Sequence, residues 1–213
     1  GTLCSLDTTN PNVVMVEKNE VPTNDKTVEE DSTGNYGETN DADIGQTVNF
    51  KSTITAQAGA ENYVFHDTMS AGLTYTGVTG ITLNGTAVDA SNYTEVTEGL
   101  TDGCTFEVRF MQAFCDTLKA NDQIVISYTA TLNENAVIAG AGNPNTSKVS
   151  YGDSSNTKTT PDSQTKTYTW DVDVLKYANG DETKVLKDAK FVLLNSAKSK
   201  VATIVSGKIT GWV

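Results

Sequence analysis

The sequence predicts an all-β protein whose main unit is a β-sandwich. Apolar and polar residues alternate in several short runs, the period of a strand with one buried face. Turn-forming clusters such as Asn84-Gly85 and residues 140–145 separate these runs. Helical periodicity is nearly absent, and only residues 111–120 are expected to form a short helical turn, with Phe114 and Leu118 four residues apart. Many short strands with turns between them are typical of a sandwich.

The elements can be justified in chain order from the positions of their apolar residues. The run 47–54 buries Val48, Phe50 and Ile54 on one face, and the run 124–132 is the longest clean alternation in the chain. Strands are expected at residues 26–28, 47–54, 63–67, 81–83, 93–96, 106–110, 124–132 and 149–151. In the third of these, Asp67 falls on the same face as Tyr63 and Phe65, and a carboxylate in a core needs an explanation because its burial is costly.

Changes in composition predict four segments. Residues 22–153 are expected to form the sandwich, and residues 1–21 are interpreted as a linker or the tail of a preceding domain. Residues 154–166 are rich in Ser, Thr and Asp and have no apolar period, so we expect a linker. A new alternation begins in residues 167–213, where Trp170, Val172 and Val174 share one face that is expected to be buried. A hairpin turn is expected at Asn179-Gly180 and a further strand at residues 189–193. This last unit is short for a sandwich core and is interpreted as the incomplete start of a second domain.

Charge and motif content exclude several classes of function. The net charge of −12 and the pI near 4.4 argue against nucleic acid and against an anionic membrane surface as partners. No apolar run is long enough to span a membrane, and no signal peptide opens the chain. No phosphate-binding loop, nucleophile elbow or pair of catalytic carboxylates is visible, so neither an enzyme nor a cofactor is predicted.

The cysteines and the single histidine predict no metal site. Cys4, Cys104 and Cys115 are odd in number and have no Cys-x-x-Cys spacing, so free, partly buried thiols are expected. His66 is the only histidine, and its position in the alternation predicts a solvent-facing strand residue rather than a catalytic base.

Three polar residues lie an even number of residues from apolar neighbours in their strands, so they share the parity, and therefore the face, of residues expected to be buried. Lys26 has the parity of Val28, Asp67 that of Phe65, and Asn145 that of later apolar residues. If the first and last strands lie side by side, a lysine, an acid and an asparagine meet in the core. Burial lowers the pKa of a lysine and raises that of an aspartate, which leaves a nucleophilic amine and an acid able to polarise an amide. Attack of the amine on the asparagine would release ammonia and leave an isopeptide bond.

Simpler interpretations of the same residues remain open. A lysine in a first strand is usually a surface or edge residue, and an asparagine in a Gly/Pro cluster usually forms a turn. Asp67 precedes Thr68 and could cap the following turn.

Several phrases, in order, resemble the fimbrial isopeptide-forming domain of sortase-assembled pilins of Gram-positive bacteria. They are DKTVEEDSTGNYG, DADIGQTVNFKSTITAQAGAENYVFHDTMSAGLTY, IVISYTATLNENAVIAGAGNPN and the strand ending in Tyr151. The resemblance implies an immunoglobulin-like sandwich related to the A-type (CnaA) domain of collagen adhesins. It also implies a bond between Lys26 and Asn145 assisted by Asp67. Asn143 is the alternative asparagine and Glu95 the alternative acid. The last strand reads YGD where many relatives read YSN.

Two further segments resemble parts of pilins. The segment TYTWDVDVLKYANGDETKVLKDAKFVLLN is similar to the opening of a B-type (CnaB, SpaA-like) domain, in which the first-strand lysine would be Lys176. The segment around Lys18 is similar to the motif whose lysine a sortase joins to the next pilin subunit, although Tyr-Pro is replaced by a single Glu. Lys18 is therefore a candidate subunit-linking residue, with an ordinary linker lysine as the alternative.

The resemblance implies a structural subunit of a Gram-positive pilus shaft, anchored to the cell wall and exposed outside the cell. Its partners would be other pilin subunits joined by a sortase, with a host surface or matrix ligand as a further possibility. The alternative is a tip adhesin or monomeric surface adhesin that uses the same domains as a stalk. A third interpretation, an accessory sandwich of a carbohydrate-active enzyme, predicts an exposed aromatic row, whereas the aromatics here follow the buried parity.

Overall fold

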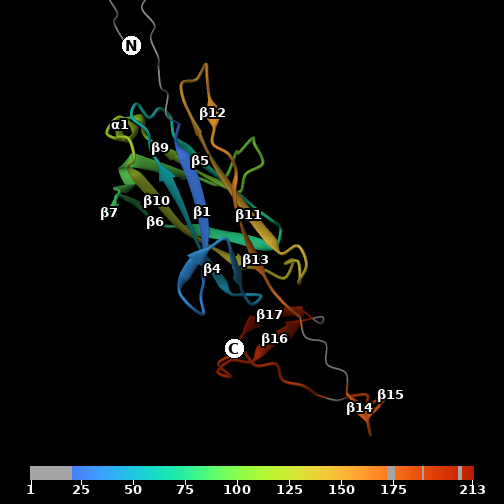
Figure 1. Cartoon of the computed structure of the whole chain (residues 1–213). Coiled ribbons are helices and arrows are strands. Elements are labelled where there is room, and N and C mark those ends of the chain that lie inside the picture. The colour runs from blue at the N-terminus through green and yellow to red at the C-terminus, as the bar shows by residue number, and fades with distance from the viewer. Residues whose placement is uncertain (1–20, 172–175, 189, 206–207) are drawn as a thin grey trace, which may run out of the picture.

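Two β-sheets form the body of the molecule (Figure 1). The computed structural model describes residues 21–171, 176–188, 190–205 and 208–213. The first sheet has the order β2 (Asn35–Gly37), β1 (Thr23–Glu30), β4 (Thr47–Thr55), β10 (Gln123–Leu132), β6 (Leu73–Leu83), β7 (Thr86–Ala87). The second has the order β3 (Thr39–Asp41), β13 (Ser163–Tyr168), β11 (Asn143–Tyr151), β5 (Val64–Met69), β9 (Phe106–Phe110), β8 (Tyr93–Val96), with β12 (Lys158–Thr159) beside β11. The predicted all-β sandwich is confirmed.

The core lies between these sheets and follows the alternation of the sequence. Along β4 and β10 every second residue is buried, so the inward faces of the two central strands of the first sheet are apolar. From the second sheet, Phe65, Phe106 and Val149 are fully buried against them. The rings of Phe65 and Phe106 both lie close to Tyr128, with centroid distances of 6.0 and 5.0 Å, so aromatic side chains fill the middle of the sandwich.

The predicted linker 154–166 contains the short strand β12 and the first four residues of β13. Residues 163–168 form β13, which pairs antiparallel with β11 and parallel with β3. The strand has no apolar period because its inward residues, Thr165 and Thr167, are buried threonines. Threonine is β-branched and favoured in strands, but it leaves no hydrophobic signal in the sequence.

The short connections follow the local sequence. Asn84 and Gly85 both have positive φ and join β6 to β7, and Asn179 and Gly180 do the same for the hairpin of the last unit. Helix α1 (Gln112–Cys115) confirms the predicted helical turn, and it buries Phe114. Among the residues that the structure describes, no helix has the length and apolar character needed to cross a membrane.

The last unit is built from two small hairpins. They are formed by β14 (Tyr177–Ala178) with β15 (Asp181–Val185), and by β16 (Ala202–Val205) with β17 (Lys208–Trp212). The predicted strand near Phe191 is wrong, because Phe191 and Val192 have no strand pairing and are 55% and 69% exposed. Trp170, expected on a buried face, is 61% exposed. Ile209 nevertheless packs against the core of the sandwich.

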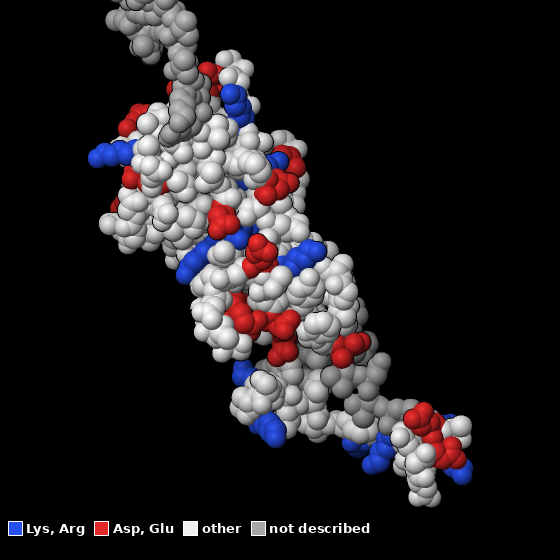
Figure 2. All heavy atoms as spheres, viewed as in Figure 1, with Lys and Arg blue, Asp and Glu red and all other residues white. Residues whose placement is uncertain are grey.

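Acidic and basic side chains are interspersed on the surface. Figure 2 shows small groups of both signs on the visible face, separated by uncharged areas. On this face the acidic side chains are not gathered in one large patch.

Candidate functional site

The three polar residues of equal parity meet inside the sandwich. Lys26 lies in the middle of β1 and points from the first sheet, whereas Asp67 and Asn145 point from the neighbouring strands β5 and β11 of the second sheet. Ser147 is the cross-strand partner of Asp67, so Asn145 lies two residues away on the same inward face. All three side chains are at most 1% exposed.

β1 and β11 face each other from the two sheets and are not neighbours in one sheet. They are tied by the side chain of Asn24, which donates to the backbone and the hydroxyl of Ser147 at 3.2 and 3.0 Å. β1 also contacts β13, since the backbone N–H of Lys26 donates to Ser163 Oγ at 2.8 Å. The expected last strand, β11, is followed by two more strands of the same sheet, β12 and β13.

A buried tyrosine completes the cluster. Lys26 Nζ and Tyr128 Oη each lie 2.5 Å from Asp67 Oδ2, and Nζ also contacts the Tyr128 hydroxyl. Nζ lies 5.1 Å from the centre of the Phe50 ring and 4.7 Å from that of Tyr128. The amine therefore has one carboxyl, one phenol and aromatic faces around it.

Burial shifts the pKa values of the two ionisable partners toward their neutral forms. Desolvation lowers the pKa of Lys26, and the attraction of Asp67 opposes that shift. Desolvation likewise raises the pKa of Asp67, against the opposing effects of Lys26, Tyr128 and Asn145. The pKa of Tyr128 is also raised, first by burial and then by Asp67, so its hydroxyl keeps its proton and donates.

The two candidate asparagines differ in what their amides do. The Asn143 side chain accepts from the backbone N–H of Val137 at 2.8 Å and donates to the carbonyls of Val137 and Thr167 at 3.0 and 3.2 Å. Neither amide atom of Asn145 has a hydrogen-bond partner among the described residues, although both are buried. Asp67 Oδ1 is likewise buried and has no hydrogen-bond partner among the described residues. The unsatisfied amide and the unsatisfied carboxyl oxygen thus belong to the same cluster.

Sequence reasoning missed Tyr128 as a polar member of the site. Its place in the alternation of β10 predicts a core aromatic, which is correct for the ring but silent about the hydroxyl. Glu95, the alternative acid, lies outside the buried cluster: it is exposed on β8 and accepts from the Tyr75 hydroxyl at 2.6 Å.

The remaining candidate residues lie elsewhere. Lys18 is outside the described residues. Lys176 is exposed, and its carbonyl accepts from the N–H of Leu186. Cys104 and Cys115 are free thiols, as expected. The prediction that His66 faces solvent is wrong: its side chain is only 14% exposed, because a loop from residues 97–105 folds over the outer face of β5 and brings Asp102 beside it.

Solved structures of pilins are similar in fold to this chain. The chain matches the 35 kDa C-terminal fragment of the major pilin GBS80 of Streptococcus agalactiae with a TM-score of 0.71 and 20% identity, over 88% of this chain and 68% of that one. It matches the major pilin BcpA of Bacillus cereus with a TM-score of 0.59 and 16% identity, over 96% of this chain and 58% of that one. For the full-length major pilin SpaD of Corynebacterium diphtheriae the TM-score is 0.57 at 18% identity, over 78% and 39% of the two chains.

At such low sequence identity the TM-scores show a shared fold, an immunoglobulin-like sandwich of the Cna type. The chain spans well under two thirds of the length of BcpA and SpaD. No match was found among curated proteins.

A family model gives the relationship by sequence. The model described as "Gram-positive pilin backbone subunit 2, Cna-B-like domain" matches residues 44–155, more than half of the chain. The matched segment includes Asp67 and Asn145 and ends after β11. Its description refers to the B-type domain, whereas the phrases of the sequence resemble the A type. This chain belongs to the family of Gram-positive pilin backbone subunits.

Proposed function

We propose that this chain is a shaft subunit of a Gram-positive pilus whose sandwich cross-links itself through an isopeptide bond between Lys26 and Asn145. The observation that carries the proposal is the buried cluster of a lysine and an aspartate, both shifted toward neutrality, beside an asparagine amide with no hydrogen-bond partner among the described residues. A buried polar amide without partners is costly, and such groups are concentrated where they have a chemical role.

The chemistry follows from the roles available to each group. Neutral Lys26 has a lone pair on Nζ, which attacks Cγ of Asn145. Protonated Asp67 donates through Oδ1 to the amide oxygen and stabilises the negative charge that develops there. The tetrahedral intermediate collapses, one proton of the amine passes to the departing nitrogen, and ammonia leaves. One C–N bond forms and one breaks, so the product is a secondary amide and no oxidant is needed.

Tyr128 is proposed as a positioning residue for this step. Its hydroxyl donates to Asp67 Oδ2, and Lys26 binds the same oxygen. Both contacts leave the other oxygen, Oδ1, free of partners among the described groups. The phenol thus holds the carboxyl in the orientation that presents Oδ1 to the amide.

The proposed bond suits a shaft subunit because it would join the two sheets covalently. Lys26 belongs to the first strand of the sandwich and Asn145 to one of its last, so the bond would close most of the domain into a ring. Separation of the sheets by force at the chain ends would then require breaking a covalent bond. The chemistry occurs once per molecule, so the proposal describes a self-processing structural protein and not an enzyme.

We also propose that residues 167–213 contain the first part of a second, B-type domain, with Lys176 as its unreacted lysine. The exposed apolar side chains of this unit support the proposal, because Trp170, Phe191 and Val192 are all more than half exposed. A complete sandwich would cover such residues. Lys18 is proposed as the residue that a sortase joins to the next subunit.

Intact mass and peptide mapping test the bond directly. The purified chain is expected to be lighter than its sequence mass by one ammonia, and digestion is expected to yield a branched peptide joining β1 to β11. Asp67→Ala should leave a folded chain of full mass, because the amide loses its acid. Thr68→Ala is the matched control, since Thr68 is the next residue of β5 and is exposed; it should keep the cross-link. A wild-type chain of full mass would refute the covalent bond.

A further inference from the structure

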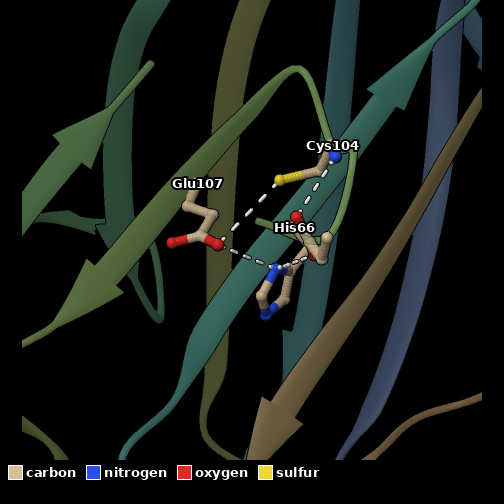
Figure 3. Close-up of side chains that lie close together, drawn as sticks. His66, Cys104 and Glu107 are labelled. Atoms are coloured by element: carbon tan, nitrogen blue, oxygen red, sulfur yellow. Dashed lines mark hydrogen bonds and ion pairs between the residues drawn. The ribbon is translucent and has the colours of Figure 1, made fainter. Parts of the chain in front are cut away.

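A second polar cluster lies on the opposite face of β5. His66 points away from the sandwich core, and Glu107 is its direct cross-strand partner on β9. The loop of residues 97–105 brings Asp102 and Cys104 over the same place (Figure 3). Figure 3 shows the three labelled side chains directed toward one another from β5, β9 and this loop. The four side chains offer one imidazole nitrogen, one thiol sulfur and two carboxylate oxygens.

The donor atoms are spaced like the ligands of one small ion. His66 Nδ1 lies 2.9 Å from Asp102 Oδ2 and 3.2 Å from Glu107 Oε1, and Cys104 Sγ lies 3.9 Å from the same Glu107 oxygen. All four atoms lie within 4.8 Å of one another. Four ligands at zinc bond lengths of about 2.0–2.3 Å, arranged as a tetrahedron, are separated by about 3.3–3.8 Å. Small side-chain rotations would therefore bring this set onto one centre.

The histidine ring gives an independent reason for a cation at this point. The other ring nitrogen, Nε2, lies 3.0 Å from the hydroxyl of Ser150. If Nε2 carries the proton and donates to that hydroxyl, the Nδ1 lone pair faces two carboxylate oxygens, which is repulsive unless a positive charge lies between them. Nδ1 is buried and makes no hydrogen bond of good geometry to any described residue. A proton or a metal ion at Nδ1 would remove the repulsion.

The surrounding groups orient the donors as outer partners of a metal site do. Arg109 Nε binds the second oxygen of Glu107 at 2.6 Å, which leaves Oε1 for the cluster. The second oxygen of Asp102 accepts from the backbone N–H of Cys104 at 3.1 Å, so the loop holds these two ligands together. With Ser150 on His66, three of the four donors have a partner that fixes their direction.

We propose that His66, Asp102, Cys104 and Glu107 form a binding site for a divalent transition-metal ion of the zinc class. A mixed set of nitrogen, sulfur and carboxylate ligands suits zinc, whereas calcium and magnesium prefer oxygen ligands alone. The site would pin the 97–105 loop to the outer face of the second sheet, on the side of β5 opposite to Asp67.

The charges of the cluster can be balanced in two ways. A divalent ion would displace the thiol proton, as metals do at cysteine ligands, and Arg109 beside Glu107 would balance the third negative charge. An imidazolium at His66 and the guanidinium of Arg109 would together balance the two carboxylates, which makes this ion pair the competing interpretation.

Cobalt(II) and zinc titrations of the full, tag-free chain test the site. After treatment with a chelator, one equivalent of cobalt is expected to produce a thiolate-to-metal charge-transfer band, and calorimetry is expected to give one bound zinc per chain. Cys104→Ser and Asp102→Asn should remove the band or weaken zinc binding by at least about 100-fold, beyond the roughly 10–100-fold effect of outer partners. Asp102 lies in an exposed loop, so its variant is expected to fold.

Cys115→Ser and Cys4→Ser are the controls, because each removes a cysteine that is not among the proposed ligands. Both variants should retain the cobalt band and the zinc affinity. A band that survives Cys104→Ser but is lost in a control would assign the metal to another thiol and overturn the proposal. Absence of both the band and zinc binding in the wild-type chain would overturn it too, and would leave His66 in an ion pair with Asp102 and Glu107.

Discussion

Asn143 and Asn145 lie two residues apart on the same inward face of β11, yet only the amide of Asn143 is hydrogen-bonded. Its three partners are backbone groups of Val137 and Thr167, so this asparagine fastens the loop before β11 and the strand β13 beside it. The side chain of Asn145 lies beside the Asp67 carboxyl instead, inside the sandwich. The two residues that the sequence leaves as equal candidates therefore have different surroundings.

Asn145→Ala should abolish the loss of ammonia and lower stability. By the loop-closure relation for cross-links, opening a ring of roughly 100 residues costs about 5 kcal/mol, or a fall in Tm of roughly 10–20 °C. Mass spectrometry and thermal unfolding measure the two effects. Asn143→Ala is the matched control: it should destabilise the chain by losing buried hydrogen bonds but keep the cross-link. A branched peptide containing Asn143 would reverse these roles.

Tyr128→Phe should slow bond formation without preventing it. The substitution keeps the ring in the core and removes the hydroxyl that donates to Asp67 Oδ2. A hydrogen bond of this kind is worth about 1.5 kcal/mol, which corresponds to a rate about tenfold lower. The fraction of cross-linked chain against time after synthesis, followed by mass, reports the rate. Tyr63→Phe, at another buried tyrosine, should have no such effect. Equal rates in all three chains would show that Tyr128 acts only through packing.

Removing Lys26 and removing Asp67 should have opposite effects on the pH dependence of stability. In Lys26→Met, buried Asp67 keeps a proton that the unfolded chain loses above a pH of about 4, so stability should fall as pH rises. In Asp67→Asn, buried Lys26 stays neutral while the unfolded chain binds a proton up to a pH of about 10.4, so stability should rise with pH.

Urea unfolding midpoints at several pH values measure both slopes, each up to about 1.4 kcal/mol per pH unit. Neither variant can form the proposed bond, so the comparison is between chains that lack the cross-link. The double variant Lys26→Met/Asp67→Asn is the control and should lose both slopes. Flat curves in the two single variants would mean that neither side chain is desolvated.

Lys18→Ala should abolish sortase-dependent polymers if Lys18 is the residue that joins successive subunits. The expectation rests on its position ahead of the sandwich, where the sequence resembles the linking motif of major pilins. Cell-wall extracts of a strain expressing the full-length protein would be examined by immunoblot for ladders of high mass. The control Lys51→Ala changes a lysine on β4 and should leave the ladders intact. Unchanged ladders in Lys18→Ala would leave that residue an ordinary linker lysine.

Residues from Tyr177 to Val213 should exchange their amide hydrogens much faster than the sandwich. Their hairpins are short, and apolar side chains such as Phe191 and Val205 are more than half exposed, so little burial opposes local opening. Hydrogen exchange followed by mass spectrometry on the full chain compares the two parts. Slow exchange throughout these hairpins in a monomer would contradict the expectation.

Strands with clean alternation were predictable, and strands with buried polar faces were not. β4 and β10 carry apolar residues at every inward position except Ser52, so period alone locates them. β13 buries Thr165 and Thr167, and nothing in its composition separates it from a linker. In the last unit, the apolar period near Phe191 describes a face that no described part of the chain covers, and no strand forms there.

The candidate site was predictable as far as parity reaches. Lys26, Asp67 and Asn145 have the parity of buried neighbours, and each is buried. The choice between the asparagines depends on the hydrogen bond from the backbone N–H of Val137 to the Asn143 side chain, a contact that forms only in the folded chain. The outer cluster of His66 was not predictable either, because its partners come from a facing strand and from a loop that only the folded chain brings back over the sheet.

The strand β13 lies outside the ring that the proposed bond would close. A pull on the two ends of the sandwich would pass directly from Lys26 to Asn145, so residues 27–144 could add nothing to the contour length. Only the roughly 20 residues from β11 to the end of β13 could unravel, which would lengthen the domain by about 70 Å at most. The backbone hydrogen bonds between β11 and β13 would break under load and could form again when the load falls. The domain would then have a small, reversible extension, while the covalent bond between Lys26 and Asn145 keeps the rest of its length fixed.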